Sequence, residues 1–112
     1  MARGTRSEEV KLTGENLADA QQIDETAELM KLAGNSTRLK LLYLLESLTE
    51  VSVSDLSELL GVSVSAVSQH LAKLKAHRLV NSRRDAQTIY YRLAEHDFIG
   101  RLREEYFGAW AH

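Results

Sequence analysis

Apolar residues return every three or four positions along the first ordered part of the chain, from residue 17 to about residue 33. This spacing places them on one side of a helix and predicts a first helix over those residues. Asn16 stands where a capping residue is expected, with Asp19 three residues further on. The apolar positions are Leu17, Ala20, Ile23, Ala27 and Met30. Residues 1–15 are polar and aperiodic, and we interpret them as a mobile tail.

A second apolar stripe begins after Gly34 and Asn35, which interrupt the first. Either Asn35 or Ser36 could cap the helix that follows, "TRLKLLYLLESL". The stripe is broad, as expected for a helix that packs on several neighbours. It consists of Leu39, Leu41, Leu42 and Leu45.

Two short helices then follow one another closely. Ser52 is placed to cap the first, over about 53–60, and Gly61 is placed to end it. Ser63 is placed to cap the second, over about 64–76. Two helices joined by a short turn that contains glycine are typical of a helix-turn-helix.

The period changes after the second short helix. The β-prone runs "LVNSRR" and "TIYYRL" flank "DAQ" and predict a hairpin over about 79–93. A last helix over about 96–110 carries apolar residues on one side, namely Phe98, Ile99, Leu102, Tyr106 and Trp110. The predicted fold is mainly α with a small β-hairpin, a winged helix-turn-helix with a helix at each end. One domain over 16–112 accounts for a chain of 112 residues.

Composition narrows the classes of function. The chain has no cysteine, which excludes disulfides, thiolate metal sites and thiol redox chemistry. It has no run of about 18 apolar residues and no apolar stretch behind its N-terminal arginines, so we expect neither a membrane span nor a signal peptide, and a cytoplasmic location. No serine, histidine and acid are positioned together as a hydrolase would need, so we expect no enzyme activity.

Charge is unevenly distributed along the chain. The net charge of −2 argues mildly against nucleic-acid binding. However, the segment 73–92 is basic, with Asp85 as its one acid. Such a local basic region can contact phosphates even on an acidic protein. Its basic residues are Lys73, Lys75, Arg78, Arg83, Arg84 and Arg92.

The outer face of the helix over 64–76 has the right chemistry to lie against DNA. At about 100° per residue, Val67, Leu71 and Leu74 form its core stripe. Ser65, Gln69 and Ala72 fall on the opposite face, flanked by Ser68 and Lys73. Short polar side chains let a helix lie deep in the major groove, where glutamine can pair with adenine. An ordinary solvated surface remains an alternative for these residues, and a protein-interaction module remains an alternative for the whole chain.

Three segments together resemble the ArsR/SmtB family of bacterial transcriptional repressors. They are "LAGNSTRLKLLYLL", "VSVSDLSELLGVSVSAVSQHLAKLKAHRLV" and "RRDAQTIYYRL". The resemblance covers about residues 17–112. It implies a homodimeric winged helix that binds a dyad-symmetric operator, with release by metal ions in many members. It does not distinguish a repressor from a metal- or ligand-responsive activator.

The resemblance also implies positions for the DNA contacts. The groove-reading positions would be Val64, Ser65, Ser68, Gln69 and His70, and the wing would run over 83–87. Within the wing, we expect Arg83, Arg84 and Gln87 to reach phosphates or the minor groove. Family wings often carry glycine after aspartate, whereas this chain has Asp85 and Ala86, so we expect a looser wing tip.

The resemblance further implies dimerisation through the first and last helices. Phe98, Ile99, Leu102, Tyr106 and Trp110 would otherwise form a large exposed apolar patch, which monomers rarely tolerate. These five residues are therefore the predicted dimer interface.

The metal sites of the family are not matched in this chain. Metal-sensing members commonly carry two cysteines at the start of the third helix, where this chain has Ser52 and Ser54. The four last-helix ligand positions fall on Glu95, Asp97, Gly108 and Ala111, and the last two have no donor side chain. We therefore expect no tight metal site at these positions. A weaker site for nickel, manganese or zinc could use Glu95, His96 and Asp97 with His112 of the partner subunit.

Overall fold

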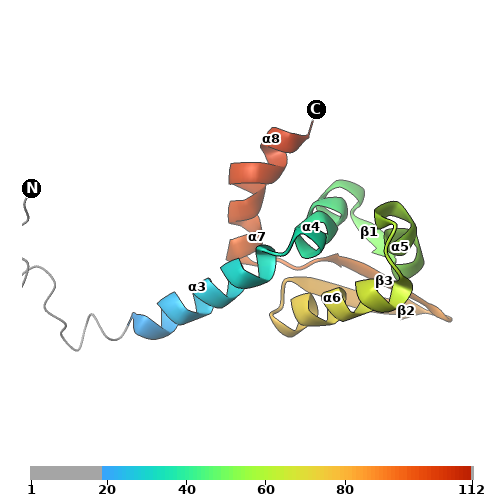
Figure 1. Cartoon of the computed structure of the whole chain (residues 1–112), viewed down its shortest axis with the longest axis horizontal. Helices are drawn as coiled ribbons and strands as arrows, with labels where there is room; N and C mark the ends of the chain where they lie inside the picture. The colour runs from blue at the N-terminus through green and yellow to red at the C-terminus, as the bar shows by residue number, and fades with distance from the viewer. Residues whose placement is uncertain (1–18, 112) are drawn as a thin grey trace, which may run out of the picture.

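The computed structural model describes residues 19–111 and has the predicted order of helices around a small sheet (Figure 1). Its helices before the sheet's hairpin are α3 (Ala20–Ala33), α4 (Ser36–Leu48), α5 (Val53–Leu60) and α6 (Val64–Ala76). The strands are β1 (Glu50–Ser52), β2 (Val80–Asp85) and β3 (Thr88–Leu93). The chain ends in α7 (Asp97–Leu102), the π-helical turn η1 (Arg103–Phe107) and α8 (Gly108–Trp110). The predicted tail, the Asn16 cap and Leu17 lie outside the described residues.

Side-chain caps define where the central helices begin. The Asn35 side chain accepts a hydrogen bond from the Arg38 amide, so Asn35, rather than Ser36, caps α4. Ser52 and Ser63 accept hydrogen bonds from the amides of Asp55 and Ala66, which confirms both predicted serine caps. Each cap satisfies an amide that the first turn of a helix leaves without a partner.

The sheet has three antiparallel strands in the order β1-β3-β2. β2 and β3 form the predicted hairpin, and β1 pairs with the free edge of β3 through Glu50–Arg92 and Ser52–Tyr90. The sequence pattern does not predict β1. Its three residues are too few to show a period of two, and they lie directly before the α5 cap.

The wing tip is tighter than predicted. Asp85 pairs with Thr88, so only Ala86 and Gln87 form the turn. Ala86 has a φ of 57°, in the left-handed region that favours glycine. The expected looser tip is therefore wrong. The chain closes a short turn without glycine, and Ala86 has the strained backbone instead.

The hydrophobic core lies where α4, α5 and α6 meet the sheet and the first turns of the last helix. Val67, Leu71 and Leu74 are fully buried, which confirms the predicted inner stripe of α6. The other fully or almost fully buried side chains are Leu41, Leu42, Leu45, Leu56, Leu79, Val80, Ile99 and Phe107. This core fixes α6 against the rest of the domain, so the opposite face of α6 is held outward in a defined orientation.

The two terminal helical segments extend away from this core. α3 projects from the body as an arm, and the α7–α8 segment rises beside it (Figure 1). In α3 only Leu32 and Ala33 are buried, whereas Ile23 and Met30 are 65% and 61% exposed. α3 therefore has an apolar stripe that the described residues leave largely uncovered.

Candidate nucleic-acid interface

The recognition face of α6, which we define as Ser65, Ser68, Gln69 and Ala72, is exposed along its length. Val64 at its beginning is 49% exposed despite being apolar. Within residues 19–111, no hydrogen bond holds the side chains of Ser65, Ser68 or Gln69. This face can therefore approach a polar partner without first breaking contacts within the described chain.

His70 lies at the edge of this face and is half-buried. Its Nδ1 is 3.3 Å from Nη1 of Arg38, which belongs to the first turn of α4. Burial lowers the pKa of His70, and the charges of Arg38 and Lys73 lower it further. The family resemblance puts His70 among the groove-reading positions, but the sequence gives no sign of this contact, because the two residues are 32 positions apart.

Arg83 in the wing is already engaged within the chain. Its guanidinium donates two hydrogen bonds of 2.9 Å to the Glu50 carboxylate of β1. It also lies 4.6 Å from the ring centroid of Tyr90 on β3. The hydrogen bond from Arg83 lowers the pKa of Glu50, and the same bond raises the pKa of Arg83. Arg83 thus joins all three strands of the sheet.

Arg84 points to the other side of the wing, because side chains alternate along a strand. Ser82 shares that side and accepts a 2.7 Å hydrogen bond from Lys75 at the end of α6. Arg84 is therefore on the side of the sheet that carries α6. It is exposed, and within the described residues it forms no ion pair.

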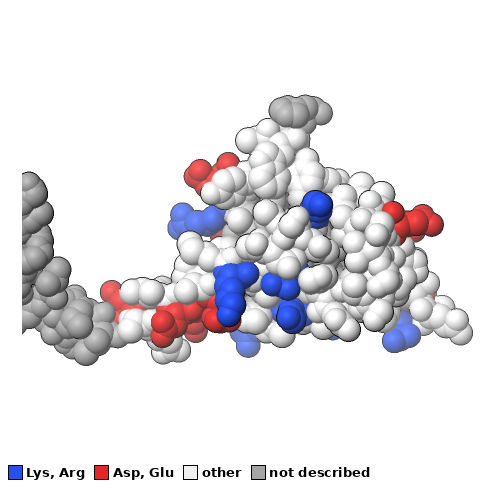
Figure 2. All heavy atoms as spheres, in the orientation of Figure 1, with Lys and Arg blue, Asp and Glu red and all other residues white. Residues whose placement is uncertain are grey.

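Basic side chains lie near the recognition face of α6, and acidic side chains lie along α3. Figure 2 shows acidic atoms along the α3 arm and basic atoms along the lower edge, where α6 and the hairpin lie. Lys73, Lys75 and Arg84 are among the exposed basic residues of that region. The edge that carries the recognition face thus presents basic side chains that would attract a polyanion.

The last helix departs from the predicted pattern because of η1. A π-helical turn inserts one extra residue, so after Leu102 the next inward position is 107 and not 106. Phe107 is 2% exposed, while Tyr106 is 51% exposed. Regular helical spacing predicts an inward Tyr106, and for that reason it does not identify Phe107 as a buried residue.

The predicted apolar patch on this helix is consequently smaller than expected. Ile99 and Leu102 are buried inside their own chain, so the expectation that they form part of an exposed patch is wrong. Phe98 is half-buried, and Tyr106 and Trp110 remain exposed. Trp110 packs against the rings of Tyr43, Tyr106 and Phe107, with centroids 5.7–5.9 Å away.

The residues at the family's metal positions do not fit a tight site. Ser52 is buried and its hydroxyl is the cap of α5, while Ser54 has a hydroxyl that stays protonated at neutral pH. Nδ1 of His96 accepts a hydrogen bond from the Phe98 amide, so only Nε2 of that ring remains available as a metal ligand. In the described part of the chain, no three His, Cys, Asp or Glu residues are grouped so that they could hold a metal ion. His112 lies outside that part.

No helix among residues 19–111 is both long and apolar enough to cross a membrane.

The family model described as "Bacterial regulatory protein, arsR family" matches residues 35–82, from the α4 cap to β2. Among curated proteins, the HTH-type transcriptional regulator KmtR of Mycobacterium tuberculosis is 41% identical over 81 residues, which are 72% of this chain and 61% of KmtR. The transcriptional activator HlyU of Vibrio cholerae is 47% identical over 66 residues, 59% of this chain and 60% of HlyU. In these sequence matches the chain spans about three-fifths of each relative's length.

Solved structures extend the similarity over most of the described fold. The structure of HlyU from Vibrio cholerae matches with a TM-score of 0.67 and 39% identity, over 76% of this chain and 95% of that one. The homodimeric winged helix-turn-helix DNA-binding domain Mb0332 from Mycobacterium bovis matches with a TM-score of 0.69 and 30% identity, over 88% and 85% of the two chains. The predicted winged helix-turn-helix is thereby confirmed.

Proposed function

Because the chain belongs to the ArsR family of bacterial regulatory proteins, we propose that it is a homodimeric transcriptional repressor that binds a dyad-symmetric operator. The observation that carries this proposal is the recognition face of α6. It is exposed and polar, and its side chains are short. The fully buried inner stripe of α6 fixes the orientation of this face. It borders a basic edge, which supplies the electrostatic attraction that DNA binding needs.

In this proposal α6 lies in the major groove. Gln69 reads a base edge, and Ser65 and Ser68 bond to base edges or phosphates. Val64, at the beginning of α6, can make an apolar contact with a thymine methyl group. Lys73, on the flank of the helix, contacts a phosphate.

The wing contributes unequally in this proposal. Arg84 and Gln87 reach the DNA backbone or the minor groove beside the recognition helix. Arg83 mainly holds the wing in place, because Glu50 and Tyr90 already bind it. This assigns different roles to two adjacent arginines that sequence analysis treated alike.

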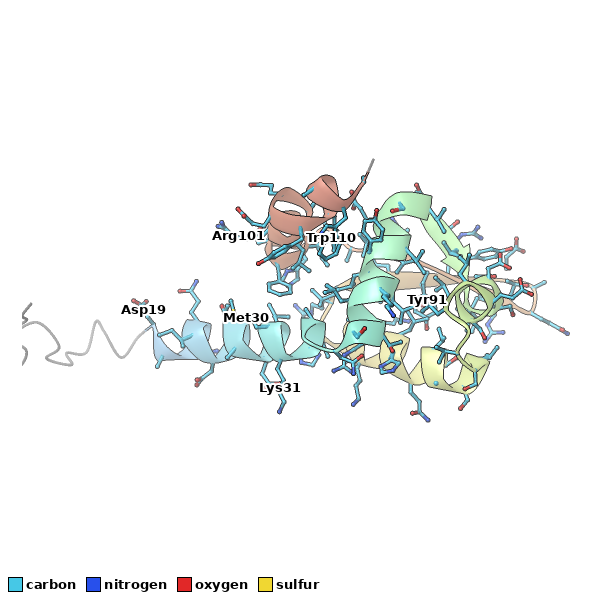
Figure 3. All side chains as sticks on the ribbon, turned by 45° about the horizontal axis from the view of Figure 1, so that its top comes forward. Asp19, Met30, Lys31, Tyr91, Arg101 and Trp110 are labelled. Atoms are coloured by element: carbon cyan, nitrogen blue, oxygen red, sulfur yellow. The ribbon has the colours of Figure 1, made fainter. Side chains whose placement is uncertain are left out.

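The dimer is supported by apolar surface that residues 19–111 of one chain leave uncovered. Ile23 and Met30 on α3 and Tyr106 and Trp110 on the last helix are all more than two-fifths exposed. Met30 extends from the side of α3 that faces the C-terminal helix, and Lys31 extends from the opposite side (Figure 3). A second copy seated on α3 and α7–α8 covers this surface and relates two α6 helices by a two-fold axis.

Fluorescence anisotropy with an operator duplex and with a random duplex tests the roles proposed for Gln69, Arg83 and Arg84. Gln69→Ala is expected to lower operator affinity about tenfold or more and leave random-duplex affinity almost unchanged, because a base contact carries the sequence preference. Arg84→Ala is expected to weaken binding to both duplexes and to reduce the salt slope by about one. The Arg83→Ala variant serves as the matched control in the wing, with a smaller reduction of the salt slope.

Salt dependence also separates this proposal from a protein-interaction module. Release of counterions makes DNA affinity fall steeply with salt, whereas docking to a protein has no such requirement. Wild-type protein that binds neither duplex at low salt contradicts the proposal. A promoter–reporter fusion then measures the direction of control. Repression predicts higher reporter output when the gene is deleted, and lower output contradicts repression in favour of activation.

We further propose that any effector of this protein acts without a tight metal site at the family positions. Titration calorimetry with zinc, nickel and cobalt on the dimer tests this. Submicromolar binding that Asp97→Ala abolishes contradicts it and assigns the ion to Glu95, His96 and Asp97.

A further inference from the structure

We infer that Arg38 is a positioning residue that fixes the tautomer of His70 and so determines which group α6 presents beside Gln69. The part of this inference that concerns DNA rests on the proposed function, whereas the part that concerns the imidazole ring does not.

Arg38 is held at several points and has little freedom to move. Its backbone amide donates to Oδ1 of Asn35 at 3.0 Å. Its Nε donates to the carbonyl oxygen of Leu32, in the last turn of α3, at 2.7 Å. Its Nη1 reaches Nδ1 of His70 at 3.3 Å. The half-buried guanidinium therefore joins the end of α3, the beginning of α4 and the middle of α6.

The chemistry of guanidinium leaves only one role for Nδ1 of His70. Arginine has five N–H donors and no acceptor, and it stays protonated in proteins. Nδ1 must therefore accept, so the single ring proton lies on Nε2. A doubly protonated ring would direct an N–H toward a positive donor, which is unfavourable.

The charged groups that act on the ring all oppose its protonation. Arg38 from α4 and Lys73 from α6 are both cationic, and partial burial acts in the same direction, so the pKa of His70 is lowered. A lowered pKa means that the folded state binds its proton more weakly than the unfolded state does. The stability that the contact provides is thus complete above about pH 6.5 and is lost as the pH falls through the lowered pKa.

A fixed tautomer has a consequence for recognition. His70 adjoins Gln69 and lies at the edge of the recognition face. With its proton on Nε2, His70 offers the DNA one N–H donor and no acceptor. Such a donor pairs with guanine O6 or N7, thymine O4 or a phosphate, and does not pair with the amino group of cytosine.

The same structure provides an internal control in His77. Nδ1 of His77 is 3.1 Å from the carbonyl oxygen of Lys73, which can only accept. His77 must therefore carry its proton on Nδ1, the opposite tautomer. A long-range proton–nitrogen correlation spectrum of the protein without DNA observes both rings at once.

The expected spectrum shows His70 neutral with the proton on Nε2 and His77 with a proton on Nδ1. The pKa of His70 should lie below the ordinary value for histidine. Arg38→Lys retains the charge but cannot bridge Leu32 and His70 together, so His70 should then populate both tautomers. A wild-type His70 that is Nδ1-protonated or mixed overturns the inference. So does an Arg38→Lys variant in which the His70 tautomer is unchanged.

Two substitutions of His70 extend the test to DNA. In His70→Asn, the amide oxygen can replace Nδ1 as the acceptor for Arg38 but does not reach the position of Nε2. It should keep the thermal midpoint near wild type and lower operator affinity about tenfold. His70→Gln reaches that position but loses the Arg38 contact, so it should keep more of the affinity and lose more of the stability.

The reverse order of the two variants overturns the role at the DNA. If wild type binds no DNA while the spectrum shows the expected tautomers, the proposed function fails and the link between Arg38 and His70 stands.

Discussion

The central part of the chain, α4 to β3, and its terminal helices, α3 and α7–α8, are held in place in different ways. α4, α5 and α6 each begin at a side-chain cap and bury their apolar stripes within the chain. α3 has no side-chain cap and buries two residues of fourteen. The central part thus has its partners within one chain. The last helix also buries Ile99, Leu102 and Phe107 in that core, but Tyr106 and Trp110, like Ile23 and Met30 of α3, are exposed, and we propose that a second copy covers them.

The two regions therefore have different proposed functions, DNA recognition for the central part and dimerisation for the terminal helices. The recognition face needs a rigid base, and the closed core under α6 provides it. The dimer interface needs uncovered apolar surface, and α3 and the last helix provide that. The ion pair of Arg103 and Glu46, at 2.9 Å, joins η1 to α4 and connects the two regions.

Leu71→Ala should have the largest effect on stability, because Leu71 is fully buried under the recognition face. We expect the free energy of unfolding to fall by about 2–5 kcal/mol. Chemical denaturation monitored by circular dichroism measures it. A loss below about 1 kcal/mol would show that α6 does not depend on this core.

Met30→Glu should weaken the proposed dimer interface on α3. Met30 is exposed in the single chain, so its own fold should be unaffected, but a buried carboxylate in the dimer should weaken association at least about tenfold. Sedimentation measures this, with Lys31→Gln as control, because it changes the charge equally on the opposite side of α3. Equal association constants for the two variants would remove Met30 from the interface.

Much of the structure of the central part can be predicted from the sequence, because it depends on residues that are close together in the chain. Ser52, Gly61 and Ser63 define their helix ends through bonds to residues a few positions away. The inner stripe of α6 follows from its period alone. The bounds of α5 and α6 are therefore those that the sequence predicts.

The features that sequence analysis missed depend on distant partners or on a change of period. β1 exists because β3 offers an edge about forty residues later. Arg38 and Glu50 gain their roles from His70 and Arg83, which no local pattern connects to them. The π turn moves Phe107 inward and Tyr106 outward, and regular helical spacing gives the wrong answer there.

Ala86→Gly should have the smallest effect, and it should be favourable. Glycine adopts the φ of 57° without strain, although it loses more backbone freedom on folding. We expect a gain of roughly 0.5–1 kcal/mol in the free energy of unfolding. A thermal melt compares the variant with wild type, and destabilisation would mean that the turn is not strained.

The most direct measurement of the central claim is selection of bound sequences from a pool of random duplexes by the wild-type protein. Two α6 helices related by a two-fold axis predict enrichment of dyad-symmetric sequences whose half-sites lie about 10–10.5 base pairs, or roughly 34 Å, apart. Gln69→Ala should lose the preference in both half-sites together. Enrichment of a single asymmetric half-site, or no enrichment at all, would contradict the account.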